Sequence, residues 1–240
     1  MMRFNTLFVL ILIAIGLRWL ILDKFELEQL LTAFLLPVGT VVLYLIVRRQ
    51  VKKEMNYVPK NELQSWSSYL GQWSVLTPKK IYNGSTYTGE FKRYYEKRWH
   101  RIIAELVEEK ELWYLSLDFT FAENTYKMHW MRNSVKKMHE SWKIEKNGQM
   151  IGNVKTNVNA KNMMTLKESM TATIGDEKFD WQSYTVGGKV EILHNGQKIG
   201  SSGRGEFFKA DVTVDIQHTY ANWEEFLVAM TLLYRSYYQK

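Results

Sequence analysis

The feature that most constrains this chain is an almost unbroken apolar stretch from Phe4 to Val47. It divides into two segments, about Phe4 to Leu22 and about Leu30 to Val47, each near the length that a helix needs to cross a bilayer. The short segment between them, residues 23–29, is mostly acidic. The pattern predicts a two-helix transmembrane hairpin. A signal peptide and a buried soluble hairpin are the competing interpretations, and the sequence around Asp23 offers no small-residue cleavage site for the former.

The distribution of Lys and Arg predicts the orientation of this hairpin. Four basic residues follow the second segment directly: Arg48, Arg49, Lys52 and Lys53. Arg3 and the terminal amine precede the first segment, whereas the connection holds one Lys. The positive-inside rule then places both termini in the cytoplasm. We therefore expect a multi-pass protein of the cell membrane whose remaining residues form a cytoplasmic domain.

That domain is polar, basic and free of cysteine. The chain has a net charge of +7 and no Cys, which excludes disulfides, thiolate chemistry and Cys-ligated metals. A basic domain beside a membrane is expected to be attracted to anionic headgroups, with a solubilising surface charge as the alternative. Aromatic residues make up 14% of the chain, enough to build a sizeable core.

The first part of the domain is predicted to be helical. Residues 54–59 are typical of a linker, and 61–73 carry apolar residues at helical spacing, which favours an amphipathic helix packed on the domain over one lying on the membrane. The stretch 91–107 also favours a helix, although 102–107 has the composition of a strand. We accordingly divide the chain into an anchor (1–54), a linker with an amphipathic helix (55–85) and a β-rich domain (86–240).

Alternating apolar residues predict strands over most of that last region. They occur in 112–121, 126–131, 164–174, 178–184 and 207–216. Asn147-Gly148 and Asn195-Gly196 each join two such stretches, and Asn-Gly favours tight β-hairpins. Because the residues around the two pairs are alike, they indicate an internally repeated sheet.

The final segment, 222–238, is a helix that is apolar on nearly every side. Asn222 is positioned to cap it, and Glu224 and Glu225 suit its first turn. A helix of this kind is buried rather than laid on a surface. A third membrane span is the alternative, which its short length and Arg235 oppose. The predicted fold class is thus a membrane-anchored α+β protein, in which a two-helix hairpin precedes an antiparallel β-rich domain with a buried C-terminal helix.

This order of elements resembles the tubby C-terminal-like superfamily, which includes the tubby proteins, the LURP-one-related proteins, the phospholipid scramblases and bacterial members. The resemblance covers about Trp142 to Tyr238 and rests on the repeated Asn-Gly turns and the apolar last helix. It implies strands closed into a barrel around that helix, and it implies binding of phosphoinositide headgroups by basic residues. Those residues cannot be matched one by one here. Scramblases carry one span after the barrel, whereas this chain has its apolar segments before it.

Motifs of known catalytic chemistry are missing from the sequence. There is no H-E-x-x-H, nucleophile elbow or P-loop, so we expect no enzyme, no cofactor, no metal and no catalytic residue. The densest basic run comprises Lys92, Arg93, Lys97, Arg98 and Arg101, interleaved with aromatic residues. Such a run suits a lipid headgroup surface or a nucleic-acid groove, and the anchor favours lipid. A solvated face balanced by nearby Glu is the alternative.

A second, smaller candidate is the segment Gly203-Arg204-Gly205, in which a turn would hold a phosphate with its backbone N–H groups. A plain hairpin or bulge is the alternative interpretation. The sequence as a whole predicts a non-enzymatic, membrane-tethered module that binds anionic lipid or a small ligand. The partners are expected to be anionic lipid and possible membrane proteins, not nucleic acid. A scaffold for other membrane proteins and a scramblase-type lipid mover are the alternative functions.

Overall fold

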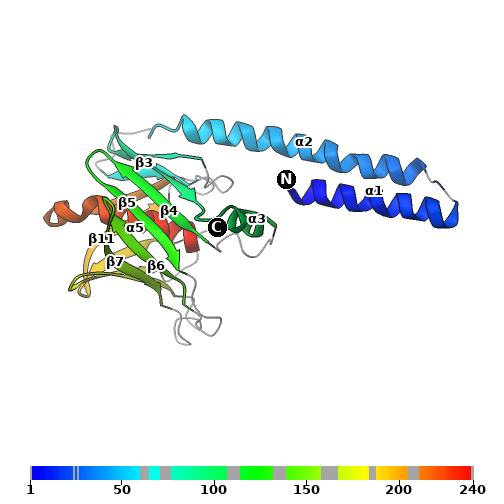
Figure 1. Cartoon of the computed structure of the whole chain (residues 1–240). Coiled ribbons are helices and arrows are strands. Elements are labelled where there is room, and N and C mark those ends of the chain that lie inside the picture. Colours follow the sequence, from blue (N-terminus) through cyan, green and yellow to red (C-terminus); the bar gives the residue numbers. More distant parts are fainter. Residues whose placement is uncertain are drawn as a thin grey trace.

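The computed structural model shows an extended helical hairpin joined to a β-barrel (Figure 1). It describes residues 2–23, 25, 27–59, 65–70, 77–106, 114–131, 139–157, 167–183, 188–204 and 211–238. The two parts meet where the second helix ends beside the barrel wall.

The hairpin consists of α1 (Met2–Leu22) and α2 (Leu27–Met55), which pack against each other. Phe8 of α1 contacts Phe34 of α2 edge-to-face, with ring centroids 5.6 Å apart. By length and composition, α2 is the one helix in the described part of the chain that is able to cross a membrane. Thr6–Leu22 of α1 is a shorter apolar helix. The two predicted apolar helices are thus present, while a second span and the orientation stay predictions.

Twelve antiparallel strands form one closed barrel, in which each strand pairs with its neighbours in sequence and β1 pairs with β12. Closure leaves no unpaired edge. The strands are β1 (Trp66–Tyr69), β2 (Lys79–Asn83), β3 (Thr86–Tyr94), β4 (Ser116–Phe121), β5 (Thr125–Met131), β6 (Ser141–Lys146), β7 (Gln149–Thr156), β8 (Glu168–Ile174), β9 (Glu177–Ser183), β10 (Val190–His194), β11 (Gln197–Arg204) and β12 (Asp211–Ile216).

The barrel encloses α5 (Glu224–Tyr238), which follows the 3-10 helix η2 (His218–Trp223). A barrel of this many strands is wider than its own side chains fill, so it needs a filler. Alternate strand residues such as Leu117 and Phe119 point inward and are fully buried, and so is every residue of α5 from 226 to 235. Inside, the Trp181 indole donates to the Thr231 hydroxyl at 2.9 Å. This confirms the predicted buried C-terminal helix and excludes its use as a span.

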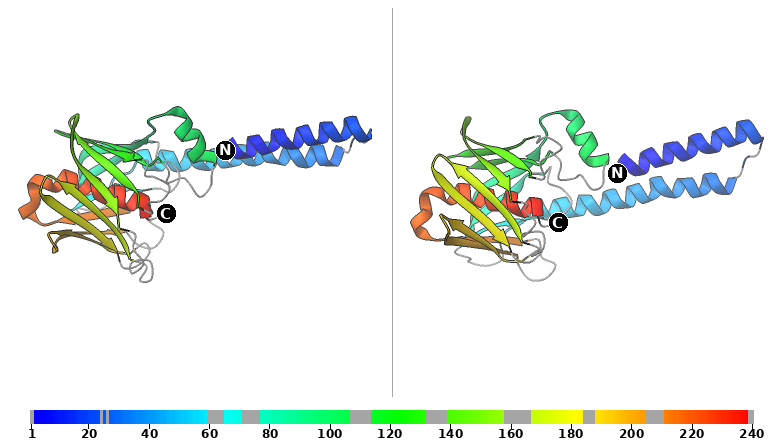
Figure 2. Two further views of the ribbon diagram at one scale, coloured as in Figure 1. Left: turned by 60° about the horizontal axis from the view of Figure 1, so that its bottom comes forward. Right: turned by 90° about the horizontal axis from the view of Figure 1, so that it is seen from below.

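The two ends of the barrel differ. At one, which we call the tight-turn end, the connections are 84–85, 122–124, 147–148, 175–176 and 195–196, together with the segment 217–223 leading to α5. At the other, the long-loop end, they are 70–78, 95–115, 132–140, 157–167, 184–189 and 205–210. α2 joins the barrel at the long-loop end, where α5 also ends (Figure 2).

The two predicted Asn-Gly hairpins are confirmed as β6–β7 and β10–β11. Asn147, Gly148, Asn195 and Gly196 all have positive φ, as a two-residue turn of this type requires. In both hairpins the register shifts by one residue at a β-bulge in the second strand, where Ile151 of β7 and Ile199 of β11 are the extra residues. Gly152 in β7 and Gly200 in β11 occupy equivalent positions in the two hairpins. A Cβ at Gly152 would lie 2.2 Å from the Thr173 carbonyl oxygen, and one at Gly200 would lie 2.5 Å from the Asp215 carbonyl oxygen. Each of these two glycines thus permits its strand to approach the following strand closely.

Several sequence predictions are corrected by the structure. Trp66–Tyr69 is a barrel strand, not part of an amphipathic helix, and the rest of 61–73 except Ser65 and Leu70 lies outside the described residues. The barrel therefore begins before residue 86. Within 91–107, residues up to Tyr94 finish β3 and the helix is α3 (Arg98–Leu106). The physical reason is closure: short strands that pair with distant segments gain their stability from tertiary contacts that no local pattern records.

Two helix boundaries also differ. The linker begins later than 54, because Glu54 and Met55 complete α2. Asn222 lies within η2 and is not the cap of α5, since a 3-10 turn leads directly into this helix.

Candidate membrane-facing site

The last two turns of α2 form the first component of the site. At a rise of about 1.5 Å per residue, the 29 residues of α2 span about 44 Å, against about 30 Å for a hydrocarbon core. The helix is thus about 14 Å longer than the hydrocarbon core, and its final eight residues, 48–55, account for most of this difference. The four predicted basic residues of the anchor all lie in this last part of α2 and are exposed: Arg48, Arg49, Lys52 and Lys53. They therefore lie together on the helix that reaches the barrel.

A buried ion pair joins α2 to the barrel wall. Lys79 Nζ at the start of β2 lies 3.2 Å from Glu54 Oε2, and the two side chains are 1% and 3% exposed. Burial lowers the pKa of Lys79, and the Glu54 carboxylate opposes that shift. Because a buried charge without a partner is costly, this pair fixes the end of α2 against β2.

Aromatic packing strengthens the same junction just beyond the helix. The Tyr57 ring contacts those of Tyr69 in β1 and Tyr82 in β2, with centroid separations of 5.4 and 6.0 Å. The Tyr82 hydroxyl also donates to the Tyr57 carbonyl at 2.9 Å. The residues after α2 therefore lie on the barrel as an ordered segment, not as a flexible linker.

The second component is α3, which projects from the long-loop end beside the N-terminal end of α1 (Figures 1 and 2). Its cations Arg98 and Arg101 are exposed, as is Lys97 in the preceding bend. His100 is buried and its ring stacks on that of Tyr114, 4.0 Å away. Burial lowers the pKa of His100, which favours a neutral imidazole. Three of the five residues of the predicted basic run thus come to the same end of the molecule as the basic end of α2.

Charge is distributed unequally between the two ends of the barrel. The connections at the tight-turn end hold no Lys or Arg, and with the first turn of α5 they carry Glu123, Asp176, Glu224 and Glu225. The described residues of the connections at the long-loop end include the cations Lys97, Arg98, Arg101, Lys167 and Lys189, against the described acidic side chains Glu96 and Glu140. The basic end is the one from which α2 departs. Sequence reasoning missed Lys167 and Lys189, because only the topology brings them to this end.

The remaining predicted residues do not join this site. Lys92 is exposed on the outer wall, while Arg93 points inward, is 9% exposed and lies 4.6 Å from the centre of the Tyr95 ring. Gly203 and Arg204 belong to β11, where their backbones pair with β12, so they form no phosphate-binding turn. Gly205 lies outside the described residues. Lys92 and Arg93 are adjacent in sequence but do not share a surface, because neighbouring strand residues point to opposite faces of the wall.

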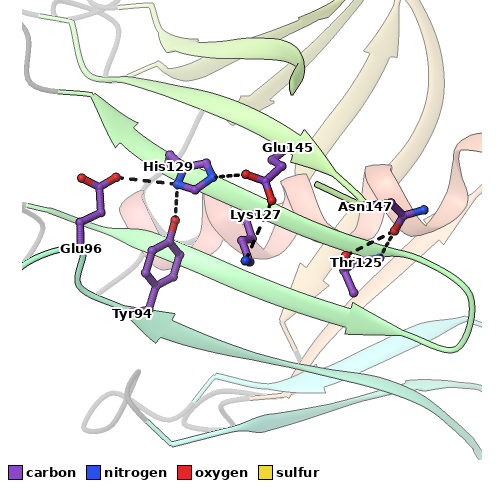
Figure 3. Close-up of polar contacts among 7 residues, drawn as sticks. All are labelled: Tyr94, Glu96, Thr125, Lys127, His129, Glu145 and Asn147. Atoms are coloured by element: carbon purple, nitrogen blue, oxygen red, sulfur yellow. Dashed lines mark hydrogen bonds and ion pairs between the residues drawn. The ribbon is translucent and has the colours of Figure 1, made fainter. Parts of the chain in front are cut away.

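A separate polar cluster lies on the outer wall across β3, β5 and β6 (Figure 3). His129 Nδ1 lies 2.6 Å from the Tyr94 hydroxyl, and its Nε2 lies 2.9 Å from Glu145. Glu96 is 3.7 Å from Nδ1. Burial, followed by the Glu96 charge, raises the pKa of Tyr94, so the hydroxyl that hydrogen-bonds with His129 stays protonated. The cluster therefore links strands of the wall to the start of the α3 connection.

Metal and buried-charge chemistry give no competing site. Within the described ranges, no group of three or more His, Asp or Glu side chains is arranged to hold a metal. Arg235 is fully buried in α5, and its guanidinium donates to the Ser202 carbonyl at 2.7 Å and to the Gly188 carbonyl at 3.2 Å. These bonds make Arg235 a structural tie between the helix and β11.

Comparison with protein families, curated proteins and solved structures gives no match to this chain. The barrel closed around a C-terminal helix has the architecture that the tubby-like resemblance implies. Membership of that superfamily stays a prediction. Fold and site define the class: a closed barrel around a helix, joined at its basic end to an apolar helical hairpin.

Proposed function

We propose that this protein is a non-enzymatic membrane-tethered module whose barrel binds anionic lipid headgroups at the cytoplasmic face. The observation that carries the proposal is the coincidence of the basic end of the barrel with the end from which α2 departs. A barrel polarised in this way is drawn toward an anionic surface by its long-loop end, at about 1 kcal/mol per well-placed Lys or Arg.

Both hairpin helices serve as spans in this proposal. The 21 residues of α1 give about 32 Å of helix, and residues 27–47 of α2 give the same length, close to a hydrocarbon core. Trp19 and Phe25 contact each other at the far end, where aromatic side chains suit the headgroup layer. Residues 48–55 then extend about 12 Å into the opposite headgroup layer, which places Lys79 and the barrel wall just outside it.

The test is co-sedimentation of a barrel fragment with vesicles of neutral phosphatidylcholine or of phosphatidylcholine mixed with anionic phosphatidylglycerol. The fragment begins at residue 50, so that it retains Glu54 and its ion pair with Lys79. Circular dichroism first establishes that the fragment is folded. Binding to anionic vesicles alone, abolished by high salt, is expected, since exposed ion pairing is screened by salt.

A matched pair of variants sharpens this test. Replacing Arg98 and Arg101 by Gln is expected to weaken binding. Replacing Lys146 and Lys198, which lie near the tight-turn end, is expected to leave it unchanged. Equal binding to neutral and anionic vesicles, or equal effects of the two replacements, would overturn the proposal.

A second candidate, a scaffold for other membrane proteins, is favoured by one observation. The hairpin helices splay around a groove of about 860 Å³, whose lining includes Ala14, Arg18, Gln29, Thr32 and Ala33. Small and polar side chains are those through which membrane helices associate. Co-purification of a partner that persists in high salt and is lost on replacing Ala14 and Ala33 by Leu would support this function. Purification of the chain alone would oppose it.

A further inference from the structure

The short helix α3 has two different faces. His100 and Ala104, four residues apart, are 8% and 1% exposed and fix the helix to the barrel. Trp99 and Ile102, three residues apart, are large apolar side chains that are 43% and 45% exposed. Residues at these spacings share a side of a helix, so one side is docked and another offers an aromatic and an aliphatic group to the surroundings.

The exposed cations of α3 flank this apolar pair. Arg98 precedes Trp99, and Arg101 precedes Ile102, and both are exposed. Tryptophan beside basic residues is the composition found where protein meets the boundary between headgroups and acyl chains. The apolar pair alone would fit many partners, whereas the adjoining positive charge favours an anionic surface.

The position of α3 matches the level of such a surface. α3 contacts α1, and Figures 1 and 2 show it beside the N-terminal end of that helix. If α1 crosses the hydrocarbon core, its N-terminal end marks the inner edge of the headgroup layer, and α3 lies at this depth. Polar headgroups occupy about 5–8 Å on each side of the core, roughly the diameter of a helix without its side chains.

We propose that α3 is an interfacial lipid-binding helix, in which Trp99 and Ile102 enter the boundary between headgroups and acyl chains while Arg98 and Arg101 bind lipid phosphates. This inference rests on the proposed function, and it adds an apolar contact that headgroup attraction does not require. The barrel then has a fixed orientation on the membrane, because α3 and α2 hold the long-loop end at two separate points. The aromatic ring of Tyr114, which contacts Trp99, His100 and Trp130, connects α3 to the wall.

The absence of cysteine makes the test direct, since one introduced Cys is the only labelling site. Full-length protein carrying Ile102→Cys or, as control, Met150→Cys is labelled with an environment-sensitive fluorophore and reconstituted into vesicles. Met150 is 58% exposed and follows the turn at 147–148, at the tight-turn end. Quenching by aqueous iodide and by lipids spin-labelled near the headgroup is then measured for both positions.

The proposal predicts that the label at 102 is several-fold less sensitive to iodide than the label at 150, and is quenched by the spin-labelled lipid. Equal iodide quenching at the two positions would overturn it, even if the barrel fragment still binds anionic vesicles. Insertion at 102 in neutral and anionic vesicles alike would support insertion of α3 and would instead count against headgroup recognition. Loss of the contrast in a Trp99→Ser background, with the label kept at residue 102, would further support it.

Discussion

The buried ion pair between α2 and β2 allows the sharpest stability prediction. Glu54→Gln removes the carboxylate charge that faces Lys79 at 3.2 Å while nearly preserving its shape. Because both side chains are at most 3% exposed, the remaining ammonium has no access to water. Loss of one partner of such a pair costs about 3–5 kcal/mol, a large part of the roughly 5–15 kcal/mol that stabilises a typical domain.

The pair itself is expected to contribute far less than this loss. The double variant Glu54→Met with Lys79→Met removes both charges and is expected to unfold within about 1–2 kcal/mol of the parent protein, since apolar replacements of whole buried pairs are often neutral. The exposed pair Lys198–Glu191, 2.7 Å apart, is the matched control. Glu191→Gln is expected to cost about 0–1 kcal/mol.

Urea unfolding of the full-length protein in detergent, followed by tryptophan fluorescence, measures all four free energies. With the single variants Glu54→Met and Lys79→Met added, a double-mutant cycle isolates the interaction free energy of the pair. A cost for Glu54→Gln no larger than that for Glu191→Gln would refute the reasoning, because it would show that Lys79 has access to solvent. It would also remove the reason for retaining Glu54 in the barrel fragment.

Three further predictions concern the barrel. Gly152→Ala is expected to destabilise it by about 1–3 kcal/mol or more, because its Cβ would meet the Thr173 carbonyl oxygen at 2.2 Å. Gly203→Ala is the control and should be nearly neutral, since the nearest atom to its Cβ is 3.5 Å away. Similar urea midpoints for the two variants would contradict the strand packing. Thr231→Val should cost about 1–3 kcal/mol by leaving the Trp181 N–H unpaired, whereas a thermal midpoint equal to that of the parent would show another acceptor. Burial raises the pKa of Tyr126 and Tyr237 to about 12. Because the unfolded chain loses these protons at a lower pH than the folded protein, the stability should fall as the pH rises above 10. Titration of these tyrosines near pH 10 without unfolding, followed by absorbance, would contradict their burial.

Local patterns predicted those elements whose stability is local. Alternation of Leu117, Phe119 and Phe121 marked one wall strand, and Asn-Gly marked two hairpins, because side-chain direction and positive φ are properties of short segments. The apolar last helix was recognisable because its residues are buried on every side. These three signals predicted the strands, the hairpins and the buried helix, while closure of the strands into a barrel around that helix was implied by the tubby-like resemblance.

Other features depended on partners far away in the chain. Trp66 and Tyr69 have helical spacing, yet they form β1 because Val214 and Asp211 pair with them across the closure. Lys79 was not singled out, and its partner Glu54 was assigned to the anchor.

Only part of the candidate site could be predicted from the sequence, for a similar reason. Clusters of basic residues were apparent at 48–53 and 92–101, but only the topology shows which of them meet. Arg93 is buried because its strand alternates inward, and Lys189 joins the long-loop end because β10 begins there. The Figure 3 cluster likewise required the register of β3, β5 and β6 before its side chains could be brought together.

The most direct test of the central claim is the topology of the full-length protein in intact cells. Phe25, 52% exposed between α1 and α2, and Met150 at the tight-turn end are each replaced by Cys in this cysteine-free chain. A membrane-impermeant maleimide is predicted to label the Phe25→Cys variant in intact cells and the Met150→Cys variant only after permeabilisation. Labelling of both variants in intact cells, or recovery of the unlabelled chain in the soluble fraction, would contradict a cytoplasmic barrel held by a membrane hairpin.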